Sequence, residues 1–330
     1  MAPTATRSRS HYIGLALIVA SVLSVSIALW KFQDIHDFIR LYGYQAPARV
    51  SAIADTTTMT NRGRKLFYVN RPQVLDAKGF ATKCPAGAEK TVVLGCYKSN
   101  DTGIYLFDVA DARLNGVVEV TAAHEMLHAA YMRLTDTERA KLDAQLTDYY
   151  ENTLQDKRIK DTIDAYKQTE PTELVNEMHS IFGTEVAELP PGLETHYAKY
   201  FVNRRAVVEL MQKYQAEFVG RQEKIDGYDS QLKQLKARID SGQAELEALG
   251  ARVEREQSRL NSLRSAGQYS AYNAAVNPYN ALVSAYNSQI YQTKADINQY
   301  NAIVEARNAV ASEQQQLMKS LSSEPVTQTR

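Results

Sequence analysis

Residues 117–131 are the stretch that most constrains how this chain folds. They read Val-Val-Glu-Val-Thr-Ala-Ala-His-Glu-Met-Leu-His-Ala-Ala-Tyr, an apolar run without proline or glycine that contains His-Glu-x-x-His. Helical positions four apart lie on one face, so His124 and His128 would point at the same neighbour. Burying these imidazoles beside Glu125 is costly unless the cluster has a partner. We therefore expect a buried helix that needs a further ligand from elsewhere in the fold.

The partner that accounts for all three residues is a divalent cation, for which we predict Zn²⁺. Two neutral imidazoles plus one further ligand leave the open fourth position that a catalytic zinc site requires. Glu125 follows the first histidine and is rotated toward a water at that position, where it would act as the general base. The alternative is a set of satisfied polar residues in a helical core.

A later helix, expected over residues 173–182 and ending at Gly183, is the predicted source of the third ligand. Its apolar residues face the core, and Glu177 lies beside them, which directs its carboxylate inward. Glu173, one turn earlier on the same face, and His179 are alternative ligands. A buried acid that caps another helix is the non-functional alternative.

With these residues, the chain resembles the gluzincin class of zinc metallopeptidases, in which HExxH is followed on a later helix by a glutamate ligand. The sequence Asn-Glu-Met-His-Ser at 176–180 is similar to the Asn-Glu-x-x-Ser form of thermolysin-like enzymes. The resemblance implies Glu177 as third ligand, Asn176 as a residue that supports the ligands, and a zincin-like α+β fold. Ile181 replaces the Asp that follows this Ser in thermolysin-like enzymes. Such enzymes also use a donor that stabilises the transition state, for which the candidates are His179, His196, Tyr197 and Tyr131.

The N-terminal region contains an uncharged apolar run at residues 13–30, close to the roughly 20 residues that span a bilayer. Arg7 and Arg9 precede it, and no acidic residue does. The positive-inside rule therefore predicts a cytoplasmic segment at 1–11, a transmembrane signal anchor at 12–30 and an extracytoplasmic remainder. A cleaved signal peptide, ending at the Ser-Ile-Ala within the run, is the alternative and exports the same remainder.

The exported part begins with residues 31–58, whose apolar positions predict a juxtamembrane helical linker. The metal domain is expected at 59–200, where two short apolar runs around the turn formers at 98–103 predict a β-hairpin. Cys84 and Cys96, the only cysteines, would form a disulfide in an oxidising compartment. Two buried free thiols are the alternative.

Residues 201–320 carry a heptad pattern that predicts a coiled-coil helical hairpin. Spacings of four and three alternate along its first half, with exceptions at Arg221, Gly242 and Glu256. The apolar series is Val207, Met211, Tyr214, Phe218, Ile225, Tyr228, Leu232, Leu235, Ile239, Leu246, Leu249, Val253, Leu260 and Leu263. A turn is expected near 265–268, followed by an antiparallel return helix with Tyr272, Tyr279, Tyr286 and Tyr300 in register and Thr293 in the gap. Asparagine follows each of these tyrosines, so stacking on a glycan is the alternative to packing between the helices.

Two functional hypotheses follow from these features. The first is a membrane-anchored extracytoplasmic zinc metallopeptidase that acts on protein or peptide substrates. The second is a non-catalytic cell-envelope scaffold with a structural or degenerate metal site, which binds an envelope partner or itself through the coiled coil. The 38 basic residues balance the 38 acidic ones, so nothing points to a nucleic-acid partner. The tail at 321–330 is expected to be disordered.

Overall fold

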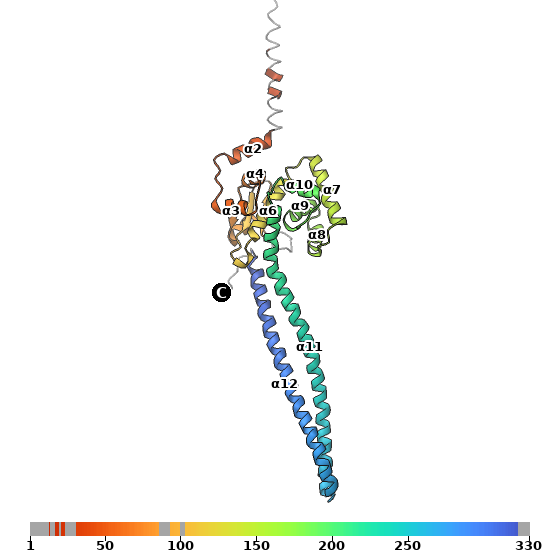
Figure 1. The fold of residues 1–330 in the computed structure, drawn as a ribbon. Coiled ribbons are helices and arrows are strands. Elements are labelled where there is room, and N and C mark those ends of the chain that lie inside the picture. The colour runs from red at the N-terminus through yellow and green to blue at the C-terminus, as the bar shows by residue number, and fades with distance from the viewer. Residues whose placement is uncertain are drawn as a thin grey trace, which may run out of the picture. The chain divides into compact units, whose positions relative to one another are not determined.

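The computed structural model describes residues 13, 17–19, 21–23, 31–85, 93–99 and 103–322 (Figure 1). These residues form two units, one up to Lys213 with the short stretch after Ser320, and one of Tyr214–Ser320. The predicted mainly helical α+β fold with a small sheet and a C-terminal helical hairpin is confirmed.

Much of the predicted N-terminal organisation lies outside the described residues. This applies to the cytoplasmic segment 1–11, to most of the anchor at 12–30 and to most of the tail at 321–330. Among the residues that are described, no helix combines the length and the apolar character needed to cross a membrane.

The first unit consists of short helices around a three-stranded sheet. In chain order its elements are α2 (Phe32–Leu41), α3 (Ala48–Thr56), α4 (Asn61–Val69), β1 (Gln73–Leu75), α5 (Ala77–Lys83), β2 (Gly95–Lys98), β3 (Gly103–Phe107), a 3₁₀ helix (Ala112–Leu114), α6 (Val117–Tyr131), α7 (Asp136–Asn152), α8 (Lys157–Thr169), α9 (Leu174–Glu185), α10 (Pro191–Tyr197) and the start of α11 (Arg204–Ser265). Side-chain caps begin several of these helices, and Thr135 and Glu138 form a capping box at the start of α7.

The sheet has the strand order β1-β3-β2. The predicted hairpin is present: β2 and β3 are antiparallel, with Cys96 opposite Tyr105. The third strand, β1, pairs in parallel with the other side of β3, so Gln73 also lies opposite Tyr105. All five residues of β3 are buried. Three residues are too few to show a strand period in the sequence, which is why β1 was not predicted.

Helix α6 is the central element of this unit. It follows Gly116, whose φ of +102° is a left-handed conformation that L residues rarely adopt. Every residue of α6 except Thr121 and His124 is buried. The helix packs against the sheet and against α3, α4 and α9, which explains why its sequence is apolar on all sides.

Helix α9 crosses α6 at a glycine. The prediction that this helix ends at Gly183 is wrong, because α9 continues to Glu185. A Cβ on Gly183 would lie 2.4 Å from Cδ1 of Leu127 and 2.8 Å from Cε1 of Tyr197. The glycine is therefore needed for close packing of α9 on α6, where it faces Leu127, the residue before His128. It does not terminate the helix.

A disulfide joins Cys84, at the end of α5, to Cys96 of β2. Around it, Phe80, Tyr105 and Phe107 form a buried cluster. This covalent link fixes β2 where the strand runs against α6.

The second unit is a hairpin of α11 and α12 (Tyr269–Ser320), which lie side by side in Figure 1. The turn contains Gly267 with a φ of +69°. Ion pairs of Asp229 with Arg307 and of Arg238 with Asp296 link the two antiparallel helices.

Two exceptions in the heptad pattern face each other in this hairpin. A Cβ on Gly242 would lie 2.7 Å from Oγ1 of Thr293, the one non-tyrosine in its series. A third exception, Arg221, is paired with Glu217 at 2.8 Å and with Glu313 at 3.4 Å. The tyrosines of α12 are half-buried at the helix contact, except that Tyr269 and Tyr291, outside the series, are exposed.

Candidate metal centre

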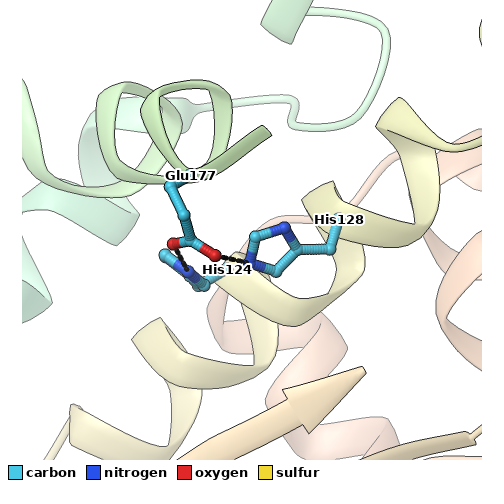
Figure 2. A group of neighbouring side chains, drawn as sticks. All are labelled: His124, His128 and Glu177. Carbon is cyan, nitrogen blue, oxygen red and sulfur yellow. Dashed lines mark ion pairs between the residues drawn. The ribbon is translucent and has the colours of Figure 1, made fainter. Parts of the chain in front are cut away.

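Three side chains from two helices converge at the α6–α9 crossing (Figure 2). His124 and His128 lie one turn apart on α6, and Glu177 extends toward both from the first turn of α9. Nε2 of His124 is 3.5 Å from Oε2 of Glu177, and Nε2 of His128 is 3.3 Å from Oε1. One potential ligand atom from each residue lies within 4.8 Å of the other two. Within the described residues, this is the one group of His, Cys, Asp or Glu side chains that meets this geometry.

The centre is mostly enclosed. The side chains of His128 and Glu177 are 10% and 11% exposed, whereas that of His124 is 19% exposed. His124 is therefore the most accessible of the three.

A hydrogen bond decides which nitrogen of His128 faces the carboxylate. Its Nδ1 lies 3.0 Å from Oδ1 of Asn176, and Nδ2 of Asn176 donates to Oε2 of Glu173 at 3.2 Å. Since the Asn176 amide group donates to the Glu173 carboxylate, its oxygen is left to accept from N–H at Nδ1 of His128. In a neutral ring, Nε2 then carries the lone pair, and it faces Glu177.

This arrangement places two hydrogen-bond acceptors against each other in a buried site. Nε2 of His128 and a carboxylate oxygen cannot hydrogen-bond without a proton or cation between them. Oε2 of Glu177 is buried and has no hydrogen-bond partner. Burial raises the pKa of Glu177, but contact with His124 and the positive charges that both imidazoles carry when protonated outweigh it and hold the pKa below the ordinary 4.5. When the imidazoles are neutral, a cation between them and the carboxylate would supply the same positive charge.

Zinc fits this donor set in chemistry and in spacing. Two imidazole nitrogens and a carboxylate oxygen are a common set for catalytic zinc. Tetrahedral ligands about 2 Å from zinc lie about 3.3 Å apart. The His124–Oε2 distance of 3.5 Å and the His128–Oε1 distance of 3.3 Å are of this size, and one ligand atom from each residue lies within 4.8 Å of the others. The alternative ligand Glu173 is instead held by Asn176, and His179 points into a separate cluster.

Glu125, the predicted general base, is buried on the same helix, against strand β2. A Cβ on Gly95 would lie 2.9 Å from both Cγ and Oε1 of Glu125, and 2.5 Å from Cγ2 of Thr121. The missing side chain at Gly95 therefore leaves the space that the Glu125 carboxylate occupies. Gly95 precedes Cys96, so the disulfide holds the strand in this position.

The four candidates for a transition-state donor are engaged elsewhere. Nε2 of His179 lies 3.0 Å from Nε2 of His196, and the Tyr197 hydroxyl donates to the His179 carbonyl at 2.7 Å. The Tyr131 hydroxyl donates to Asp143 at 2.7 Å. Among the described residues, none of the four hydrogen-bonds or ion-pairs with His124, His128 or Glu177.

The His179–His196 pair is neutral because of its surroundings. Burial and, to a smaller extent, the nearby cations Lys199 and Arg62 lower the pKa of His196 to about 4. Burial, followed by the charge of His196, takes the pKa of His179 well below 6.5. The pair therefore acts as a polar part of the core, stacked against Tyr197.

Sequence reasoning missed two contributors to the centre, Gly95 and the Glu173–Asn176 contact. Gly95 lies in an apolar run where a glycine carries no sign of what faces it. Glu173 was considered as a ligand, but its observed partner, three residues on, is the amide that orients His128. A carboxylate three residues before Asn176 on one helix face was the available signal.

Comparison of the chain with models of known protein families, with curated proteins and with solved structures finds no match. The centre is therefore interpreted from its own geometry.

Proposed function

We propose that this chain is a membrane-anchored extracytoplasmic zinc metallopeptidase with His124, His128 and Glu177 as zinc ligands. The observation that carries the proposal is the buried contact between the Glu177 carboxylate and two imidazole nitrogens, which a cation would resolve. The resemblance of the same residues to the HExxH and Asn-Glu motifs of gluzincins also supports it. In this proposal residues 59–200 are the zincin-like domain and 201–320 are an arm.

A zinc ion bound here supplies Lewis acidity, which lowers the pKa of a water and polarises a peptide carbonyl. Glu125 takes up a proton from the attacking water and returns it to the leaving amine. Asn176 keeps Nε2 of His128 directed at the centre. β2, which pairs with β3 on one side, offers its other edge to an extended peptide.

The test combines metal content with hydrolysis of an unstructured protein such as reduced casein. We expect about one zinc per chain and cleavage that a chelator abolishes and zinc restores. Glu125→Gln should retain zinc and lose hydrolysis, because the amide cannot accept the proton. Activity equal to the unmodified protein in this variant, or loss of its zinc, would contradict the assignment.

The scaffold hypothesis draws on the hairpin of α11 and α12, which are linked by ion pairs. It predicts that Glu125→Gln is functionally silent and that disruption of the hairpin abolishes function. The peptidase proposal instead predicts that Glu125→Gln reduces hydrolysis more than disruption of the hairpin does.

A further inference from the structure

Helix α2 presents its apolar side chains to solvent and buries a charge. Its single buried residue is Asp37. Five large apolar side chains on the helix and its C-cap are exposed: Phe32 (66%), Ile35 (45%), Phe38 (68%), Ile39 (65%) and Tyr42 (79%). This is the inverse of a helix that packs on a protein core.

The exposed residues form one continuous face. At 3.6 residues per turn they fall within an arc of about 120°, and Asp37 lies on the opposite side. Apolar patches of this kind, bordered by polar residues, mark sites of interaction.

The buried side of α2 is fixed to the metal domain by charge. Both oxygens of Asp37 accept from Arg133, each at 2.8 Å, and Lys65 of α4 lies 3.1 Å away. Burial raises the pKa of Asp37, but Arg133 and Lys65 outweigh it and keep the pKa below 3.8. Because Arg133 follows α6 by two residues, α2 is attached to the end of the helix that carries the histidines.

The sequence before the helix bears on what could cover the exposed face. The apolar run 13–30 ends directly before Lys31 and Phe32, so the face begins where a membrane-spanning segment would leave the bilayer. A short helix with one apolar and one charged side suits the interface between headgroups and acyl chains. Phenylalanine is typical of the apolar side of such helices, and tyrosine, here Tyr42, favours the interfacial layer itself.

We propose that this face of α2 lies in the interfacial layer of the lipid bilayer and holds the metal domain against the membrane surface. The inference rests on the anchor in the proposed function, but not on hydrolysis. It implies that the substrates within reach are peptide segments close to that surface.

The test uses the full chain reconstituted in phosphatidylcholine vesicles, with and without lipid brominated near the start of the acyl chain. Trp30 is the only tryptophan, so it reports on the end of the anchor in the unmodified protein. In a Trp30→Phe background, Phe38→Trp reports on the face of α2. Val202→Trp, at a residue 79% exposed elsewhere in the same unit, is the matched control.

We expect the fluorescence of Phe38→Trp to lie at a shorter wavelength than that of Val202→Trp and to be quenched by brominated lipid. The fluorescence of Val202→Trp should be neither shifted nor quenched. Quenching at Trp30 without quenching at position 38 would overturn this inference and leave the anchor standing. If neither were quenched, both would fail. A blue-shifted Phe38→Trp signal that brominated lipid does not quench would assign the face to a protein, such as a second copy, and would also overturn the inference.

Discussion

Oδ1 of Asn176 lies 3.0 Å from Nδ1 of His128, and this contact sets the ring nitrogen that faces Glu177. The asparagine is itself oriented by its 3.2 Å bond to Glu173. The side chains of Glu173 and Asn176 thus orient the lone pair on Nε2 of His128 toward the place where a cation would bind.

Replacing Asn176 should therefore weaken metal binding without removing a ligand. Asn176→Ala frees the His128 ring to rotate, and loss of such a supporting bond lowers metal affinity by about 10- to 100-fold. Competition with a chromogenic chelator measures this. Asn152→Ala is the control, because that exposed asparagine at the end of α7 donates its side-chain hydrogen bond to Asp148, far from the candidate ligands in the sequence. Equal zinc affinity in both variants would show that the Asn176 contact does not orient a ligand.

The two glutamates of the 173–177 turn should respond differently to the same change. Glu177→Gln removes the charged ligand, so we expect it to abolish stoichiometric zinc. Glu173→Gln keeps an acceptor for Asn176, so zinc affinity should change less than about tenfold. Metal analysis after dialysis distinguishes them, and the opposite order would make Glu173 the ligand.

The part of the fold and of the candidate site that could be predicted from the sequence is the part in which the contacting residues lie close together in the chain. The spacing of His124 and His128 and the Asn-Glu pair at 176–177 are local patterns, and they were enough to select the three residues that the structure brings together as a possible metal site. The roles of Gly95 and Gly183 depend on what packs against them from distant parts of the chain. Periodicity shows that a glycine interrupts a pattern but not what occupies the space it leaves.

Helix α2 shows that an ion pair between residues far apart in the chain is also not predictable from local sequence. Its spacing predicted an amphipathic helix, and an apolar face is ordinarily assumed to point at the core. The partner of Asp37 is Arg133, 96 residues later, and no local pattern reveals that pairing. In the second unit, Gly242 and Thr293 appeared as separate exceptions until the antiparallel register placed them together.

Gly183→Ala should destabilise the fold through the α6–α9 contact. The added methyl meets Leu127 at 2.4 Å in a close-packed crossing, and overpacking of this kind costs about 1–3 kcal/mol. Because Leu127 precedes His128, zinc affinity should fall as well. Leu127→Ala in the same chain makes room and should restore part of the affinity.

The control for this glycine lies in α11. A Cβ on Gly220 would contact nothing within 4 Å, so Gly220→Ala should stabilise its helix by about 0.5–1 kcal/mol. Thermal unfolding of both variants provides the comparison. Stabilisation by Gly183→Ala would mean that the two helices are not packed as closely as described.

Gly95→Ala should reduce hydrolysis while leaving zinc in place. Its methyl would press on Glu125, and the disulfide at Cys96 restrains the strand from moving away. Displacement of a general base by about 1 Å lowers the rate on the order of 100-fold. Adding Thr121→Ser removes the other close contact, the methyl at 2.5 Å, and leaves only the conflict with Glu125. Recovery of full activity in the double variant would show that the Thr121 contact, and not Glu125, explains the loss.

Acid should destabilise the protein through His196. Its pKa is about 4 in the folded state, because of burial and then of Lys199 and Arg62, and about 6.5 when unfolded. Between these values the unfolded chain binds more protons, so the stability present above pH 6.5 is lost as the pH falls toward 4. The loss from this residue is about 3 kcal/mol.

Urea unfolding at pH 7 and pH 4.5 measures this loss, with chelator present so that metal release does not contribute. The difference in unfolding free energy between the two pH values should be smaller for His196→Gln than for the unmodified chain. His179 retains its own contribution, so the difference should shrink without disappearing, and an unchanged difference would mean that His196 is not neutral in the core.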